Sequence, residues 1–154
     1  EWTPAISLGA SILIPDVYVA DLGVRLGLYR RISSLVDAQE IEAFAAELID
    51  RFGPIPPEVE NLLEAITLKR LCRDAGVAKL DAGPKGAVVT FRDNNFCNPA
   101  GLVAFITDQA GTVQIRQDHK LVYRRNWDEG RKRMTGSRRL MRKLSDIAGQ
   151  ANAA

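Results

Sequence analysis

The chain of 154 residues contains few side chains that could act as a nucleophile, a base or a metal ligand. The single histidine, His119, has no second imidazole and no cysteine within metal-ligand spacing. Cys97 could attack as a thiolate only with His119 as its base, and helix-breaking residues surround it. Ser33, Ser34 and Ser137 have neither a nearby base nor the glycines of a nucleophile elbow. The sequence therefore argues against catalysis.

Motifs for nucleotides, cofactors and metals are also missing from the sequence. No Gly-x-x-x-x-Gly-Lys-Ser/Thr loop occurs, and no paired glycines follow a strand in the dinucleotide-binding pattern. Glu47 and Asp50 stand three residues apart, but helical carboxylates at this spacing usually lie in solvent rather than around a cation. We therefore expect a chain that is not an enzyme, with no catalytic residue, no cofactor and no metal.

The two cysteines and the apolar segments bear on the compartment. Cys72 falls in an apolar helical pattern and Cys97 in a polar turn, and the sequence leaves a disulfide between them open. No apolar run approaches the roughly 20 residues of a membrane-spanning helix, and no secretory signal is present. We expect a cytoplasmic chain without membrane contact, in which both thiols stay reduced. The first residue is Glu1 rather than Met, which indicates either a fragment of a longer chain or a processed chain.

Charge is distributed unevenly along a chain of ordinary globular composition. Hydrophobic residues make up 46% and charged residues 26%, and the formal net charge is +2. Residues 37–64 carry eight acidic side chains against a single Arg51, whereas residues 124–143 carry nine basic side chains against two acidic ones. Each stretch is a solvated helix face, or the two face each other, or at least one of them contacts a partner.

The clearest element of the sequence is an acidic helix at 37–52. Asp37 is its predicted N-cap and Glu40 the capping-box partner, while Gly53 and Pro54 end it. Its apolar residues recur at helical spacing and predict a buried stripe of Ile41, Phe44, Ala45, Leu48, Ile49 and Phe52. Glu47 and Asp50 are then expected on the opposite, solvent-facing side.

The other elements are predicted from changes in apolar periodicity. In order they are an extended segment at 5–14, a helix capped by Asp16 or Asp21 that ends near Val36, a helix at 56–75, strands at 77–80, 87–91, 112–115 and 120–123, a helix that begins at Asn98, and a helix at 126–148. Asp118 and His119 form the predicted tip of the last hairpin. The pattern indicates one α+β domain: N-terminal helices, then a small, mostly antiparallel sheet with one helix inserted, then a long C-terminal helix.

Two helices of this fold have a predicted inner stripe. The helix that ends near Val36 is expected to bury Leu22, Leu26, Tyr29, Ile32 and Val36. The last helix is expected to bury Trp127, Met134, Met141 and Leu144, with Gly136 weakening its middle and residues 149–154 fraying.

The basic C-terminal helix has a candidate nucleic-acid surface. Its members are Arg131, Lys132, Arg133, Arg138, Arg139 and Arg142, which could neutralise phosphates in a salt-dependent way. No helix-turn-helix or zinc-finger pattern accompanies them, and only Trp127 could stack on a base. A solvated or protein-facing surface is the alternative that we favour.

Several segments resemble the C-terminal domain of the bacterial transcription-repair coupling factor family. They are residues 13–19 (LIPDVYV), 25–32 (RLGLYRRI), 47–56 (ELIDRFGPIP) and 139–144 (RLMRKL), together with Asn98-Pro99 before a helix. The similarity extends from about Trp2 to Ile147. It implies that residues 1–154 are the regulatory domain of a larger ATP-driven DNA translocase that pushes stalled RNA polymerase and recruits excision repair.

The resemblance also implies a partner. In this family the C-terminal domain folds back on a UvrB-like N-terminal module of the same protein and hides its UvrA-binding surface. By similarity, Glu47 and Asp50 are the candidate contacts with arginines of that module, and Arg51 is a weaker one. We expect the isolated domain to be monomeric and to contact DNA weakly. A basic nucleic-acid-binding accessory domain, acting through the C-terminal helix, is the alternative function.

Overall fold

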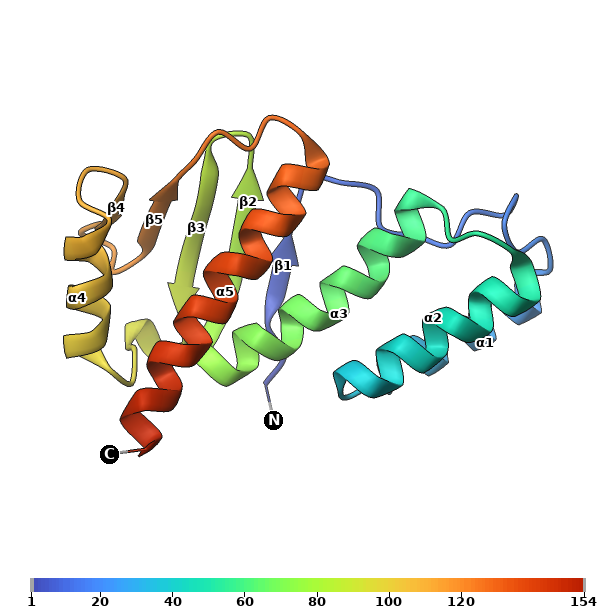
Figure 1. The fold of residues 1–154 in the computed structure, drawn as a ribbon, viewed down its shortest axis with the longest axis horizontal. Helices are drawn as coiled ribbons and strands as arrows, with labels where there is room; N and C mark the ends of the chain where they lie inside the picture. Colours follow the sequence, from blue (N-terminus) through green and yellow to red (C-terminus); the bar gives the residue numbers. More distant parts are fainter. Residues whose placement is uncertain (1, 154) are drawn as a thin grey trace. The chain divides into compact units, whose positions relative to one another are not determined.

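The computed structural model describes residues 2–153, in which five α-helices accompany a mixed five-stranded sheet (Figure 1). The elements are β1 (Ala5–Ser7), α1 (Leu22–Ser33), α2 (Ala38–Phe52), α3 (Pro57–Ala75), β2 (Val77–Gly83), β3 (Gly86–Phe91), a 3₁₀ turn (Arg92–Asn94), α4 (Pro99–Asp108), β4 (Val113–Ile115), β5 (Leu121–Arg124) and α5 (Gly130–Ala153). After the short strand β1, the order is three helices, a mostly antiparallel sheet with α4 inserted, and a long closing helix. The α+β prediction is confirmed.

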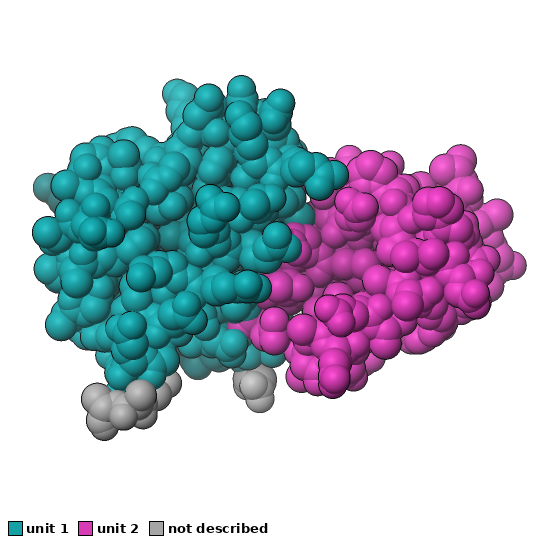
Figure 2. Space-filling model, in the orientation of Figure 1, with its two compact units in different colours: residues 1–9, 71–154 teal, residues 10–70 magenta. Residues whose placement is uncertain are grey.

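Contacts along the chain gather in two compact units (Figure 2). The helical unit comprises residues 10–70, and the sheet unit comprises residues 1–9 and 71–154. The second boundary falls inside α3, which therefore begins in one unit and ends in the other. Neither boundary has the glycine, proline or charge runs of a linker, which is why the sequence pattern alone does not reveal the two units.

The sheet unit is built on strands in the order β1-β2-β3-β5-β4. The pairs β2–β3, β3–β5 and β5–β4 are antiparallel, whereas β1 runs parallel to β2 with Ile6 opposite Leu80. Only residues 5–7 of the predicted extended segment at 5–14 form a strand. His119 turns the hairpin between β4 and β5 with a left-handed φ of 68°, which confirms the predicted tip.

Helix α5 supplies much of the core of the sheet unit and packs against β2 and α4 (Figure 1). Its predicted stripe is confirmed, since Met134, Met141 and Leu144 are buried together with Trp127. A Cβ on Gly136 would overlap the indole of Trp127, so this glycine is a close-packing position rather than a weak point. The helix starts four residues later than predicted, and it continues through Ala153 where fraying was expected.

Helix α2 of the helical unit follows the sequence prediction closely. The Asp37 side chain accepts from the Glu40 backbone at 2.9 Å, and the Glu40 carboxylate accepts from the Asp37 backbone at 3.4 Å. Gly53 ends the helix with a φ of 93°, which favours glycine. The predicted inner stripe is wrong at Ile49, which is 52% exposed. The core of this unit consists of Ile14, Val19, Leu28, Ile32, Ile41, Phe44, Leu48, Val59 and Leu63.

Helix α1 faces the core with different residues from those predicted. Asp21 caps it by accepting from the Val24 backbone at 2.8 Å, and its buried residues are Leu28 and Ile32. Of the predicted stripe, the exposed members are Leu22 (60%), Leu26 (47%) and Val36 (69%). Apolar residues spread over more than half of the circumference of this helix, so their spacing does not identify the inner side.

Candidate interaction surfaces

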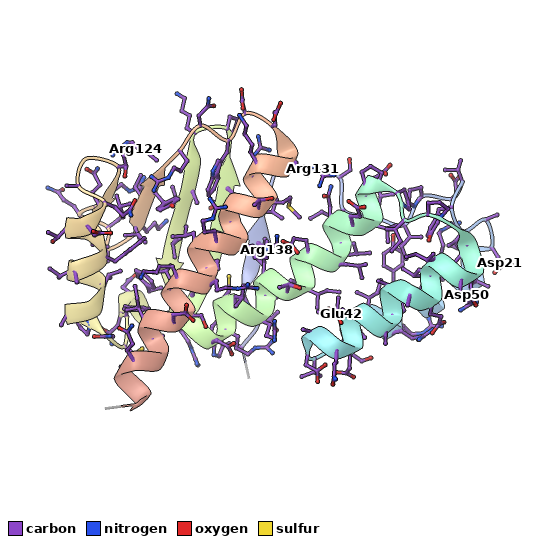
Figure 3. All side chains as sticks on the ribbon, viewed as in Figure 1. Asp21, Glu42, Asp50, Arg124, Arg131 and Arg138 are labelled. Carbon is purple, nitrogen blue, oxygen red and sulfur yellow. The ribbon has the colours of Figure 1, made fainter. Side chains whose placement is uncertain are left out.

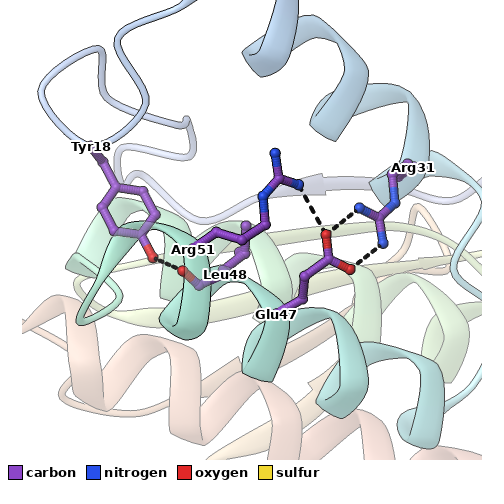
Figure 4. Close-up of polar contacts among 5 residues, drawn as sticks. All are labelled: Tyr18, Arg31, Glu47, Leu48 and Arg51. Atoms are coloured by element: carbon purple, nitrogen blue, oxygen red, sulfur yellow. Dashed lines mark hydrogen bonds and ion pairs between the residues drawn. The ribbon is translucent and has the colours of Figure 1, made fainter.

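Glu47 on α2 bridges two arginines of its own unit (Figure 4). Its two oxygens accept from the Arg31 guanidinium at 2.6 and 2.7 Å, and one of them also accepts from Arg51 at 3.0 Å. A carboxylate offers about four acceptor positions, so about one remains on Glu47. The sequence places Glu47 in solvent, ready for a partner, whereas the structure commits most of its acceptor capacity to α1 and α2.

These hydrogen bonds favour the ionised form of Glu47. Donation by Arg31, and next by Arg51, lowers the pKa of Glu47 to about 2 from its ordinary value of 4.5. The same hydrogen bond raises the pKa of Arg31. Each guanidinium also covers an aromatic ring of α2, with Arg31 at 4.9 Å from the Phe44 centroid and Arg51 at 4.8 Å from that of Phe52. The network therefore links α1 to α2 and fixes the position of one helix against the other.

Tyr18 anchors the C-terminal end of α2 from the loop before α1 (Figure 4). Its hydroxyl donates to the carbonyl oxygens of Leu48 and Gly53, at 3.2 and 2.9 Å, and its ring lies 5.7 Å from that of Phe52. Burial raises the pKa of Tyr18, so the hydroxyl remains a donor. Sequence reasoning missed this contact and the Arg31 pair, because both join residues distant in sequence. Both fix the segment of α2 that carries Asp50.

Asp50, unlike Glu47, is a carboxylate of α2 that remains available to a partner (Figure 3). It is exposed, and within the described chain no hydrogen bond or ion pair engages its side chain. Glu42, two turns earlier on the same helix, is also exposed. The helical unit contains ten acidic and six basic side chains, a net charge of −4. Its surface is therefore suited to a basic partner.

Arg133 lies inside the sheet unit, which corrects its assignment to the nucleic-acid surface. It is 8% exposed, and its guanidinium donates to the backbone carbonyls of Leu8 at 2.9 Å and Trp127 at 3.1 Å. A longer contact of 3.5 Å reaches Gly9. A run of basic residues in sequence does not reveal which member points inward. Arg133 joins the N-terminal segment to α5 and is not accessible to phosphates.

The other cations of α5 stay at the surface of the sheet unit. Arg131 and Arg138 mark its course in Figure 3. Lys132 pairs with Asp128 at 3.6 Å. A hollow of about 370 Å³ is lined by Thr135, Arg138, Arg139, Arg142, Lys143 and Asp146. The sheet unit has fifteen basic and nine acidic side chains, a net charge of +6, so the two units differ in sign.

The remaining chemical groups form no further centre among residues 2–153. No three His, Cys, Asp or Glu side chains in this range are placed to hold a metal ion. Cys72 and Cys97 are both free thiols, which agrees with the expectation that they stay reduced. None of the helices in this range combines the length and apolar character that crossing a membrane requires.

The described residues thus form an α+β module in which the candidate interaction surfaces lie on two helices, the acidic α2 and the basic α5. The chain belongs to the TRCF domain family, because the model of that family matches residues 8–102. It is similar to the transcription-repair-coupling factor of Rickettsia conorii (strain ATCC VR-613 / Malish 7), with 43% identity over 120 residues, or 78% of this chain and 11% of that protein. The factor of Rickettsia bellii (strain RML369-C) is 39% identical over 144 residues, or 94% of this chain and 13% of that protein.

A solved structure shares the fold along nearly the whole chain. The crystal structure of the C-terminal domain of a transcription-repair coupling factor superposes with a TM-score of 0.79 at 18% identity, covering 97% of this chain and 98% of that one. This confirms the resemblance found in the sequence. The chain spans only about a tenth of the length of the curated relatives, from 11% to 13% of the two described above.

Proposed function

We propose that this chain is the C-terminal regulatory domain of a transcription-repair coupling factor and acts by docking rather than by catalysis. In the longer cytoplasmic protein it covers the UvrA-binding surface of a UvrB-like N-terminal module. The cover opens when the ATP-dependent DNA translocase engages stalled RNA polymerase. Membership of the family supports the identity of the parent protein. The observation that carries the docking mechanism is the exposed, unpaired carboxylate of Asp50 on an immobilised helix.

Within this proposal Glu47 and Asp50 have different tasks. Asp50 offers its acceptor positions to an arginine of the docking partner, a pair that is often bidentate. Glu47 positions Arg31 and Arg51, and it has room for about one further donor. Arg51 follows Asp50 directly in the chain and pairs with Glu47 at 3.0 Å, which keeps its positive charge from neutralising Asp50.

Exposed charge pairs suit a cover that must open. A tethered domain meets its docking surface at about millimolar effective concentration, so modest affinity keeps it closed. Moving the equilibrium from about 1:99 to about 99:1 requires roughly 5.5 kcal/mol of differential binding. A few exposed ion pairs, each contributing about 0–1 kcal/mol, can be broken by a motor that rearranges on DNA.

The first experiment compares UvrA binding by the longer protein with and without residues 1–154. Tighter UvrA binding by the truncated protein is the expected result, because truncation uncovers the surface. Equal binding by both proteins would overturn the masking proposal. Surface plasmon resonance with immobilised UvrA gives the dissociation constants directly.

A second experiment separates the two carboxylates. Asp50→Lys in the longer protein should increase UvrA binding several-fold, but less than truncation does, because a single exposed ion pair contributes only about 0–1 kcal/mol. Glu42→Lys, on the same helix and also exposed, is the matched control and should have little effect. Equal effects of the two reversals would mean that net charge, rather than a contact at Asp50, governs docking. Circular dichroism of each variant checks that α2 remains folded.

A further inference from the structure

The outward cations of α5 make a second surface that the docking proposal does not use. We propose that Arg139, Arg142 and Lys143, with Arg138 beside them, bind the phosphate backbone of double-stranded DNA. All four line the hollow of about 370 Å³ on α5. The site lies in the sheet unit, whereas docking through Asp50 uses the helical unit, so the two proposals stand on separate residues.

The spacing of the cations fits a polyphosphate rather than a single small anion. They recur at 138, 139, 142 and 143, with Arg131 and Lys132 two turns earlier. At about 1.5 Å per residue, the span from 131 to 143 is about 18 Å. Duplex DNA carries one phosphate per about 1.7 Å of its axis, counting both strands, so this length of duplex carries about ten phosphates, of which the helix faces only those on its own side. The long, flexible arginine and lysine side chains can reach the phosphates that lie nearest to them.

Three cations of the hollow are not engaged within the protein. Arg139, Arg142 and Lys143 are exposed, and in the described part of the chain no hydrogen bond or ion pair holds them. Lys132, in contrast, is paired with Asp128 at 3.6 Å. Asp146 lines the C-terminal end of the hollow and repels phosphate there. The favourable positions are therefore in the turns of Arg138 to Lys143.

The same surface lacks what single-stranded nucleic acid requires. Proteins that bind single strands stack bases on exposed aromatic rings between their cations. Trp127, the one aromatic residue next to the basic run that the sequence offered for stacking, is 6% exposed and packed against Gly136. Helix α5 itself contains no aromatic residue. Backbone contacts without base stacking favour a duplex and predict binding without sequence preference.

The test measures fluorescence anisotropy of a labelled duplex of about 20 base pairs with the 154-residue chain, at salt from about 50 to about 200 mM. We expect a dissociation constant on the order of 10⁻⁵ M at the lowest salt. The slope of log K against log salt should be about −3, because about three phosphates are neutralised at −0.9 each. Changing Arg139, Arg142 and Lys143 together to Glu should weaken binding at least tenfold.

The matched control reverses three exposed or half-exposed cations elsewhere in the sheet unit. Changing Lys79, Lys85 and Arg124 to Glu alters the net charge by the same amount and leaves α5 intact, although it also breaks the exposed ion pair of Lys79 with Asp81 at 3.4 Å. Arg124 lies on β5, away from the hollow (Figure 3). This variant should bind within about threefold of the unchanged chain, since only distant charge is altered.

Three results would overturn the assignment of this site. They are absence of duplex binding at the lowest salt, equal weakening by the two triple variants, and single-stranded binding as tight as duplex binding. Circular dichroism of both variants guards against loss of fold, and the same three positions changed to Gln provide a milder replacement. Neither result depends on UvrA, so failure here leaves the masking proposal standing, and the reverse also holds.

Discussion

Arg133 and Leu8 are joined by a hydrogen bond of 2.9 Å across 125 positions of the chain. The guanidinium also reaches the carbonyl of Trp127, so one side chain ties the segment after β1 to the start of α5. Both acceptors are backbone carbonyls of buried residues, and each would lose its partner if the guanidinium were removed. The parallel strand β1 is therefore fastened at its end as well as along its ladder with β2.

Arg133→Met should destabilise the fold by about 2–4 kcal/mol, because charge-assisted hydrogen bonds are lost and buried carbonyls remain unsatisfied. Urea unfolding followed by circular dichroism measures the change. Arg139→Met, on the exposed side of the same helix, should stay within about 0.5 kcal/mol of the unchanged chain. Equal stabilities of the two variants would contradict the structural task of Arg133.

Glu47→Gln should lower stability near neutral pH and lose this effect in acid. The folded-state pKa of Glu47 is about 2, below its ordinary value of 4.5, so the stabilisation is fully present above about pH 4.5 and disappears as the pH falls towards 2. The urea midpoints of the two proteins should converge over that range, and added salt should reduce their difference because the network is exposed.

Glu42→Gln removes a carboxylate from the same helix without breaking an ion pair and is the control for Glu47→Gln. The difference between the urea midpoint of Glu42→Gln and that of the unchanged protein should not shrink as the pH falls from about 4.5 towards 2. A direct check is the NMR titration of the Glu47 carboxyl carbon, which should report a pKa of about 2. A constant difference between wild type and Glu47→Gln from neutral to acid pH would contradict the ion-pair network.

Gly136→Ala and Gly149→Ala should change stability in opposite directions, although both add a methyl group to α5. The Cβ at 136 overlaps the Trp127 ring, so we expect a net loss of about 1–2 kcal/mol despite the gain in helix propensity. At 149 nothing lies within 4 Å, and a gain of about 0.5 kcal/mol is expected. Thermal unfolding of the two variants measures both changes. A stabilising effect of Gly136→Ala would contradict the close packing of Gly136 against Trp127.

Cys97 should react with an aromatic disulfide reagent at once, whereas Cys72 should react only when the chain unfolds. Cys97 is exposed, but burial keeps Cys72 from the reagent and raises its pKa to about 12, so almost no thiolate is present. The absorbance of the released thiol should show one rapid equivalent and a second in urea. Two rapid equivalents without urea would contradict the burial of Cys72.

The parts of the fold that the sequence predicted are those set by neighbouring residues. The capping box of Asp37 and Glu40 and the stop at Gly53 are local signals, and α2 follows them. The hairpin tip at His119 is likewise local. The inner face of α1 was not predictable, because Leu22 and Leu26 are as apolar as the residues that are buried.

What the sequence could not provide depends on residues distant in the chain. Glu47 is acidic and helical whether or not Arg31 reaches it from the preceding helix, so its engagement becomes visible only in three dimensions. Arg133 reads as one more cation in a basic run, yet its partner Leu8 lies 125 positions earlier. The candidate carboxylates were identified by resemblance, and only the structure distinguishes the available Asp50 from the committed Glu47.

The contact between Gly136 and Trp127 has a consequence for how chains of this family can vary. The indole of Trp127 fills the space that a Cβ at position 136 would occupy. Neither residue can therefore change in size alone without loss of packing. A larger residue at 136 is expected only alongside a smaller one at 127. Related sequences should therefore show the two positions substituted as a pair, a covariation that an alignment of those sequences can detect.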